Sequence, residues 1–325
     1  MRIEARTISW ALREPFTISR GTMTTIDGIL VTLSDGDHRG RGEAYGIIYE
    51  DETPQSMLAE IDAVRGAIEA GVNREALLSL LPFGGARCAI DCALWDLEAK
   101  RSGTPAWQAA CLSPLRPIAT AFTIGMRPVT EVERTAAAYA AFDLLKIKVD
   151  AQDPIAVIAA ARAGAPKPRF IVDPNQSWSF DQMVALTPQL QALGVALLEQ
   201  PLPVNGDDAL AGYPSPIPIC ADELIHDRHD LPRARGKYSH VNIKLDKTGG
   251  LTEALALAHA ARDEGFGLMV GCMAGSSLAM APAALIGQLC DFVDLDGPLL
   301  QIEDWESAMA CRDGVLDPPQ PALWG

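Results

Sequence analysis

Two lysines separated by a single residue, Lys146 and Lys148, lie in the apolar segment 144–149. Because alternate residues of a strand point to the same face, both amines would project into whatever this strand lines. Taken alone, such a pair is more typical of an edge strand whose lysines are solvated. The downstream sequence favours a shared site instead, because further short apolar segments follow, each ending in a polar residue at a nearly constant interval.

The polar residues that end these segments form a regular series. They are Lys148, Asp173, Glu199, Asp222, Lys244, Cys272 and Asp294 or Asp296. Successive members are separated by 25, 26, 23, 22, 28 and 22–24 residues. A strand, a helix and their two loops take a similar length, so the series predicts one repeated β/α unit per step.

Three acids of the series, Asp173, Glu199 and Asp222, would stand at the ends of consecutive strands. Converging carboxylates repel one another and need a counter-ion. An all-oxygen donor set suits Mg²⁺, with Mn²⁺ as a substitute. Any one of these acids could instead cap the following helix or pair with a lysine. The prediction of a metal site therefore rests on the three acids together.

Two lysines flank this acidic set, Lys148 one strand before it and Lys244 one strand after it. A nearby divalent cation lowers the pKa of a lysine, and Lys146 would add to this effect at Lys148. Two amines on opposite sides of one carbon could remove a proton from one face and return one to the other. That reaction is an epimerisation or racemisation, in which the metal would stabilise an enolate-like intermediate. The simpler role for Lys244 is an ion pair with Asp222, which is compatible with catalysis.

The sequence after Lys244 carries a further lysine. Lys247 lies past the end of the strand, and we expect it in a loop. Gly249 and Gly250 follow it and are expected to form the turn into the next helix.

The pattern of apolar and helical segments changes near residue 116, so that 116–298 differs from 1–115. In 116–298, eight short apolar segments alternate with helical stretches such as 155–162, 180–193 and 251–264. Eight strands in this length favour a parallel β/α barrel over an open doubly wound sheet, because a barrel brings every strand end to one rim.

The first 115 residues predict an α+β unit. We expect antiparallel strands at 3–12 and 28–33 and loops at 13–21 and 40–53. Helical patterns follow at 55–71, 74–81 and 86–101. The tail 299–325 is irregular and is expected to fold back on this N-terminal unit.

Composition excludes several classes of protein. A formal net charge of −15 argues against a nucleic-acid partner. The charge-free stretch 265–290 is interrupted by glycines and a proline, so it favours a strand, a loop and a buried helix over a membrane span. No signal peptide is expected at the start of the sequence, and the seven cysteines include no Cys-x-x-Cys pair. These features favour a cytoplasmic protein with reduced thiols.

Five short motifs together resemble the enolase superfamily, in its muconate-lactonising subgroup. They are Lys146-Ile147-Lys148, Asp173-Pro174-Asn175, Glu199-Gln200-Pro201, Ala221-Asp222-Glu223 and Asn242-Ile243-Lys244. The resemblance implies a (β/α)₇β TIM-like catalytic barrel at 116–298 and an α+β capping domain at 1–115 joined by the tail 299–325. It also implies the superfamily's chemistry of a lysine base with Mg²⁺. In this sequence the implied metal ligands are Asp173, Glu199 and Asp222, the implied acid/base residues are Lys148 and Lys244, and Lys146 assists.

Within the subgroup, Asp294-Leu295-Asp296 is the feature that separates the reactions. Period-2 spacing places both carboxylates on one face, where they could hold a substrate ammonium rather than face solvent. The resemblance implies that such a pair holds the N-terminus of a dipeptide, and so predicts an L-Ala-D/L-Glu epimerase that inverts the α-carbon of the C-terminal residue. It also implies that Arg20, rather than being merely solvated, binds the glutamate side chain. Thr123, Cys272 and Met273 complete the predicted substrate-binding residues.

Other activities stay open at this stage. A cycloisomerase, an o-succinylbenzoate synthase or an N-acylamino acid racemase would use the same metal and lysines. A Schiff-base aldolase would use Lys148 or Lys244 as a nucleophile and would need no metal. A non-catalytic binding barrel leaves the Lys–Asp–Glu–Asp–Lys series unexplained. The expected partner is a small-molecule dipeptide, with neither nucleic acid nor membrane, and a homo-oligomer is left open; the expected activity would serve the recycling of peptidoglycan peptides.

Overall fold

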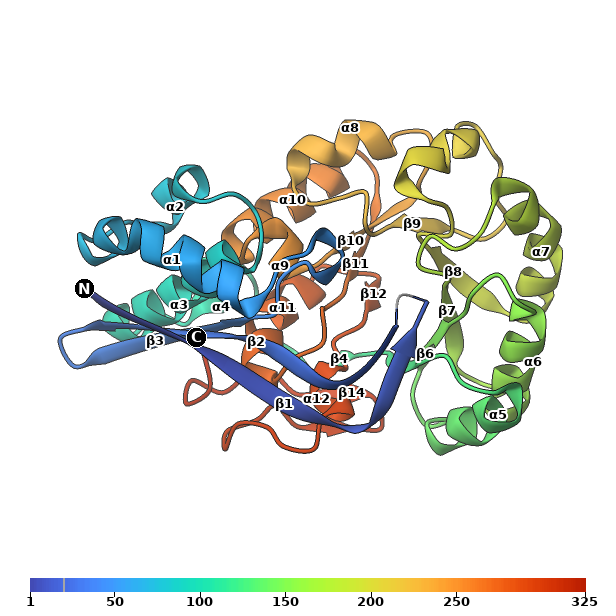
Figure 1. Cartoon of the computed structure of the whole chain (residues 1–325), viewed down its shortest axis with the longest axis horizontal. Helices are drawn as coiled ribbons and strands as arrows, with labels where there is room; N and C mark the ends of the chain where they lie inside the picture. Colours follow the sequence, from blue (N-terminus) through green and yellow to red (C-terminus); the bar gives the residue numbers. More distant parts are fainter. Residues whose placement is uncertain (20) are drawn as a thin grey trace.

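The computed structural model describes residues 1–19 and 21–325. An antiparallel sheet with its helices lies beside a curled parallel sheet, and both ends of the chain lie over the antiparallel side (Figure 1). Among the described residues, no helix is long and apolar enough to cross a bilayer.

The antiparallel sheet contains three strands in the order β1(Arg2–Ile18), β2(Gly21–Asp35) and β3(His38–Ala44). The expectation of a loop at 13–21 is wrong for the residues described, because β1 and β2 continue to pair until Ile18 lies opposite Gly21. Phe16 and Thr17 have side chains that favour strands and face partners on β2, after a shift in register that follows Ala11. The resulting hairpin reaches over the parallel sheet (Figure 1).

The expected loop at 40–53 is also partly wrong, because β3 extends to Ala44. Its glycines do not mark a turn. A Cβ atom at Gly40 or Gly42 would collide with the backbone of the helix α3(Gly85–Ser102), so these glycines allow the strand and the helix to pack closely. The loop begins only at Tyr45 and contains the short 3₁₀ helix η1(Ile48–Glu50).

The helices of the N-terminal unit are confirmed. They are α1(Pro54–Glu69), α2(Arg74–Leu80) and α3, followed by the short α4(Ala106–Ala109). Thr53 and Ser56 form a capping box at the start of α1, and Gly103 ends α3 in the left-handed region with a φ of 68°.

The parallel sheet is built as the repeats predict. Its eight strands are β5(Phe122–Ile124), β6(Leu144–Lys148), β7(Arg169–Asp173), β8(Val195–Glu199), β9(Ile219–Ala221), β10(His240–Ile243), β11(Gly267–Val270) and β12(Phe292–Val293), in that order across the sheet. The two outer strands meet where the backbone N–H of Ala121 donates to the carbonyl oxygen of Val293, at 2.8 Å. The barrel prediction is therefore confirmed.

The connections between these strands are mostly helical. The helices are α5(Val129–Ala138), α6(Pro154–Gly164), α7(Phe180–Ala192), α9(Leu245–Thr248), α10(Leu251–Asp263) and α11(Ser277–Gly287). Two connections depart from regular helices and contain η2(Val204–Leu210), and η3(Arg228–Asp230) with α8(Leu231–Ala234). The apolar stretch 265–290 forms β11, a loop and the buried helix α11, as expected.

The apolar segment 118–124, the first of the eight expected barrel strands, is divided. Its start forms β4(Ile118–Ala119), which pairs with the tail strand β14(Val315–Leu316), itself paired with β13(Cys311–Arg312). The tail also contains α12(Gly297–Leu300) and then returns to the N-terminal unit. There the indole N–H of Trp324 donates to the carbonyl oxygen of Cys92, and the N–H of Gly325 donates to Asp96. The boundaries at 115/116 and 298/299 stay a prediction.

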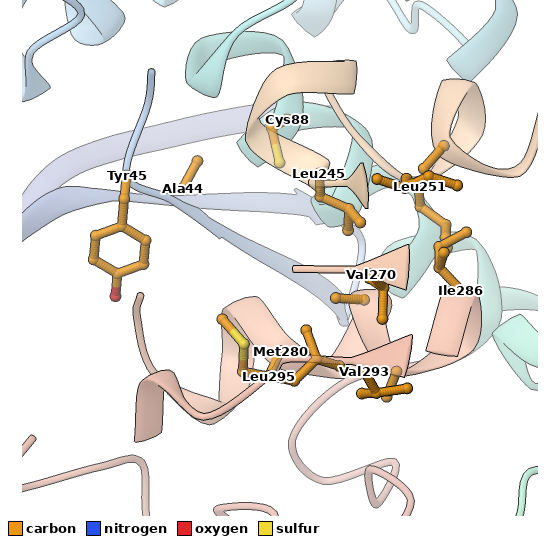
Figure 2. Close-up of a cluster of buried hydrophobic side chains, with 14 of the residues drawn as sticks. Ala44, Tyr45, Cys88, Leu245, Leu251, Val270, Met280, Ile286, Val293 and Leu295 are labelled. Atoms are coloured by element: carbon orange, nitrogen blue, oxygen red, sulfur yellow. The ribbon is translucent and has the colours of Figure 1, made fainter. Parts of the chain in front are cut away.

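The N-terminal unit and the barrel share a buried interface. Figure 2 shows Ala44, Tyr45 and Cys88 on one side of it and Leu245 and Val270 on the other. Because these side chains are fully or almost fully buried, apolar contact holds the two units together.

A buried carboxylate, Glu43, lies in the same interface. It accepts hydrogen bonds from the indoles of Trp10 and Trp305 at 3.0 Å each, from the hydroxyl of Ser276 at 2.5 Å and from the hydroxyl of Tyr45. These donors come from β1, the tail, the barrel and β3's end. Burial raises the pKa of Glu43 to about 7, although hydrogen bonds from Ser276 and the two indoles oppose the shift.

Candidate active site

A cavity of about 410 Å³ opens at the carboxyl ends of the barrel strands. The hairpin of β1 and β2 and the loop after β3 cover it, and Phe16, Ile18, Met23 and Ile48 give it an apolar wall. The predicted residues that line it are Thr123, Lys146, Lys148, Asp222, Lys244, Cys272, Met273, Asp294 and Asp296. Catalytic groups of β/α barrels gather at this face.

The register of the sheet places the first lysine against the first acid. Lys148 on β6 pairs directly with Asp173 on β7. Its ammonium lies 2.6 Å from Asp173 Oδ2 and donates to the side-chain oxygen of Asn175 at 2.9 Å. Burial would raise the pKa of Asp173, but the ammonium groups of Lys148 and Lys146 lower it to about 2. Asn175 is a site residue that was not predicted, although it completes the Asp-Pro-Asn motif.

The three predicted metal ligands are all buried and come from neighbouring strands. Asp173 and Glu199 end β7 and β8, and Asp222 follows β9. Glu199 accepts a hydrogen bond from the side-chain amide of Asn242 at 2.9 Å. Burial, with the charge of Asp173, raises the pKa of Glu199 to about 7. A carboxylate held in this way gains from a nearby cation.

Lys146 supplies a cation at this point. Its ammonium lies 3.1 Å from Asp173, 2.8 Å from Glu199 and 2.9 Å from Asp294. Burial lowers the pKa of Lys146, but Asp294, Glu199 and Asp173 outweigh it and hold the pKa well above its usual value. The prediction that Lys146 and Lys148 share a face is confirmed, and Lys146 is the more deeply buried of the two.

The three carboxylates offer oxygen donors to a divalent metal. Among the described residues, no group of three His, Cys, Asp or Glu side chains is arranged as a formed metal site. The reason is visible in the geometry, because the Lys146 ammonium lies between Asp173 and Glu199. The donors themselves are three buried carboxylates from adjacent strands, which is the chemistry that a hard cation such as Mg²⁺ requires. In donor type, Asp173, Glu199 and Asp222 therefore fit a divalent cation such as Mg²⁺.

The second predicted base lies on the other side of the acids. Lys244 follows β10, and its ammonium is 2.7 Å from Asp222 Oδ2. Burial lowers the pKa of Lys244, but Asp222 reverses this and the net shift is upward. Three strands separate Lys148 from Lys244 in the sheet, and both amines line the same cavity.

The expectation for Lys247 is wrong. This residue is fully buried in α9, and its ammonium donates to Asp222 Oδ1 at 2.7 Å, to the carbonyl oxygen of Asn242 at 3.1 Å and to the carbonyl oxygen of Asp222. Burial lowers the pKa of Lys247 although Asp222 opposes this. Its spacing of three residues from Lys244 was the available signal, because α9 turns it back toward the strand ends. Gly249 and Gly250 do form the turn into α10.

The Asp294 and Asp296 carboxylates are buried, so they are not a solvent-facing pair. Thr123 connects them, because its hydroxyl donates to Asp294 at 3.2 Å and its backbone N–H donates to Asp296 at 2.6 Å. Burial and the charge of Asp294 raise the pKa of Asp296 to about 7. Within the described part of the chain, Asp296 has no ion-pair partner, whereas Asp294 has Lys146.

The loop 45–53 is fixed close to the second base. Asp246, two residues after Lys244, accepts hydrogen bonds from the backbone N–H groups of Tyr45 and Gly46 at 2.7 and 2.8 Å. Burial raises the pKa of Asp246 to about 7. The buried carboxylate therefore ties this loop to the end of β10.

The other predicted substrate-binding residues are Arg20, Cys272 and Met273. Arg20 lies outside the described residues. Cys272 and Met273 line the cavity, and burial raises the pKa of the Cys272 thiol. A thiol with a raised pKa is a poor nucleophile at neutral pH.

Two family models match the chain. The model described as "Enolase C-terminal domain-like" matches residues 129–320, and that of the "Mandelate racemase / muconate lactonizing enzyme, N-terminal domain" matches residues 2–109. An N-acetyl-D-glutamate racemase from Pseudoalteromonas is 41% identical, over 91% of this chain and 95% of its own. An L-Ala-D/L-Glu epimerase from Escherichia coli is 40% identical, over 95% of this chain and 97% of its own.

Solved structures are equally similar. An enolase family member from Agrobacterium tumefaciens with homology to dipeptide epimerases, solved with sodium and L-Ala-L-Glu, has a TM-score of 0.97 and 42% identity over 99% of each chain. A dipeptide epimerase from Methylococcus capsulatus, solved with Mg and L-Arg-D-Lys, has a TM-score of 0.89 and 30% identity over 99% of this chain and 98% of its own.

Proposed function

This chain belongs to the mandelate racemase and muconate lactonizing enzyme family of the enolase superfamily, and we propose that it is an L-Ala-D/L-Glu epimerase. Relatives that carry this name, and structures of relatives with bound dipeptides, support the proposal. It would invert the α-carbon of the C-terminal residue. The reaction needs a way to acidify that carbon, a base on each face and a site for the N-terminus.

The observation that carries the proposal is the buried pair of Asp294 and Asp296. Lys146 pairs with Asp294, and Asp296 has no cation among the described residues. A buried carboxylate without a cation is destabilised, and a substrate ammonium would relieve this. Muconate and succinylbenzoate precursors carry no ammonium. A dipeptide does.

A second candidate is N-acetylglutamate racemisation, which the Pseudoalteromonas relative favours. Its substrate has the same acidic α-carbon, but its acylated nitrogen carries no charge. It would therefore leave Asp296 without a cation. For this reason we place the dipeptide first.

The proposed roles follow from the geometry of the lysines. Lys148 and Lys244 would each hold or move one proton at the substrate α-carbon, one on each face. When bound, Mg²⁺, with Mn²⁺ as a substitute, would be held by Asp173, Glu199 and Asp222 and would supply charge stabilisation at the substrate carboxylate. Lys146 would neutralise Asp294 and contribute positive charge beside the substrate carboxylate. The apolar wall would exclude water from the reacting centre.

The setting of the enzyme is also a proposal. All seven cysteines are free in the part of the chain that the structure describes, which supports a reducing compartment such as the cytoplasm. An activity on Ala-Glu dipeptides would serve the recycling of peptidoglycan peptides. A homo-oligomer stays a prediction.

The test is ¹H NMR of L-Ala-L-Glu in D₂O with the protein and Mg²⁺, with and without EDTA. Metal-dependent loss of the glutamate α-proton signal, with appearance of L-Ala-D-Glu, is the expected result. Exchange of N-acetyl-L-glutamate but not of the dipeptide would favour the second candidate. Exchange of neither would refute both.

A further inference from the structure

A second cavity of about 450 Å³ lies directly beside the first. The hairpin, the helix α5 and the tail enclose it. Phe16, Thr123 and Leu300 line both cavities, so the two share a wall. A cavity of this size is within the range that binds small molecules.

The shared wall fixes where the second cavity begins. Thr123 donates to Asp294 and Asp296, the two carboxylates that would hold the substrate ammonium. A substituent on the carbon that carries this ammonium would therefore lie next to Thr123. In a dipeptide, that substituent is the side chain of the N-terminal residue.

The second cavity is positively charged around an aromatic floor. Phe122 and Tyr139 stack on each other there. The charged residues that line the cavity are Arg13, Arg127, Arg134, Glu14 and Glu131.

Within the described part of the chain, Arg127 is the one arginine of this cavity that forms an ion pair. Arg127 pairs with Glu14 at 2.8 Å and donates to the hydroxyl of Thr135 at 2.9 Å. Arg13 and Arg134 have no ion-pair partner within 4 Å among residues 1–19 and 21–325. Among the residues that the structure describes, two guanidinium groups without an ion pair therefore line the cavity together with one carboxylate without an ion pair, that of Glu131.

We propose that this second cavity binds the side-chain carboxylate of an acidic N-terminal residue. The substrate class would then include dipeptides such as L-Glu-L-Glu, beside L-Ala-L-Glu. Arg13 and Arg134 would bind the carboxylate, since a guanidinium fork matches it in shape and charge. The methylene groups would lie on Phe122 and Tyr139. This inference rests on the proposed function, because it assumes that the ammonium lies at Asp294 and Asp296.

The experiment compares kcat/KM for L-Glu-L-Glu and L-Ala-L-Glu in the full-length, Mg²⁺-loaded protein. In the double variant Arg13→Gln with Arg134→Gln, the ratio of the two values should fall at least about tenfold, the change that a loss of about 1.4 kcal/mol of binding free energy produces. Arg39→Gln, an exposed arginine on β3, is the matched control and should leave the ratio unchanged. Arg134→Glu should shift the preference toward L-Lys-L-Glu.

Each other outcome is decisive. An unchanged ratio in the double variant would overturn the assignment of the cavity while leaving the epimerase intact. So would a wild-type protein that exchanges L-Ala-L-Glu but prefers L-Leu-L-Glu to L-Glu-L-Glu. Absence of exchange with every dipeptide would overturn the proposed function and this inference with it.

Discussion

Lys247 contacts Asp222 twice, through its carboxylate oxygen Oδ1 at 2.7 Å and through its backbone carbonyl oxygen. The other carboxylate oxygen, Oδ2, is left to face Lys244 at 2.7 Å. Burial would raise the pKa of Asp222, but Lys244 and Lys247 together hold it well below its usual value. Lys247 is therefore a positioning residue that fixes which oxygen of Asp222 points into the site.

Lys247→Met should lower the free energy of unfolding by about 3 kcal/mol, because it leaves a buried carboxylate with one cation fewer. It should also weaken Mg²⁺ binding, since Asp222 would lose its orientation. Chemical denaturation and calorimetric titration with Mg²⁺ would measure the two effects. Lys167→Met, at an exposed lysine, is the control. A variant as stable as the wild type would contradict the role given to Lys247.

Lys148→Ala and Lys244→Ala should each reduce epimerisation at least about a hundredfold, the scale of a lost general acid or base. Each variant keeps one base, so it should still exchange the α-proton of one epimer with D₂O without inverting it. The two variants should retain exchange with opposite epimers. NMR of L-Ala-L-Glu and L-Ala-D-Glu would show this. Near-normal epimerisation in either variant would refute the two-base scheme.

Asp296→Asn should raise KM for L-Ala-L-Glu about tenfold with a smaller effect on kcat, because it removes the charge opposite the ammonium. Steady-state kinetics of the dipeptide would test this. Asp181→Asn, at an exposed acid on α7, should leave KM unchanged. If the Asp296 variant also kept its KM, the ammonium site would lie elsewhere.

Glu43 should make stability depend on pH. Its pKa is raised from 4.5 to about 7 on folding, so the folded state binds the proton more tightly than the unfolded state. Its contribution is therefore fully present below pH 4.5 and is lost as the pH rises through about 7. The loss is on the order of 3 kcal/mol.

The measurement is chemical denaturation of the wild type and of Glu43→Gln at pH 5 and pH 8. Burial raises the pKa values of Asp246 and Asp91 as well, so the pH dependence of the wild type alone does not report on Glu43. The contribution of Glu43 is the difference between the wild type and Glu43→Gln in the loss of unfolding free energy from pH 5 to pH 8. Equal losses of stability between the two pH values would show that Glu43 does not titrate in this range.

The sequence predicts the series of polar residues at the strand ends because each of its members ends one repeat. In a parallel barrel, the repeat itself brings Lys148, Asp222 and Lys244 to one rim, whatever the detail of the loops. The position of Lys146 is harder to predict. Period-2 spacing gives its face, but its place between Asp173 and Glu199 depends on how deep in the barrel it lies.

The end of the β1–β2 hairpin and the full length of β3 were not predicted, because loops were expected at 13–21 and 40–53. The segment around Ile18 is polar and contains Gly21, which is typical of a loop. It nevertheless forms strands, because Phe16, Thr17 and Ile18 pair with Met23, Thr22 and Gly21. Gly40 and Gly42 look like turn residues but serve close packing against α3. For Gly40 and Gly42, the deciding contact comes from α3, a part of the chain that local patterns around β3 do not include.

The helix α3 binds residues that are far away in the chain. Trp324 and Gly325 bind Cys92 and Asp96, which lie 232 and 229 positions earlier. During translation, α3 leaves the ribosome long before these residues exist, and the whole barrel is synthesised in between. Such distant contacts form late and leave apolar surface uncovered in the meantime. The packing of α3 is therefore completed only by the tail.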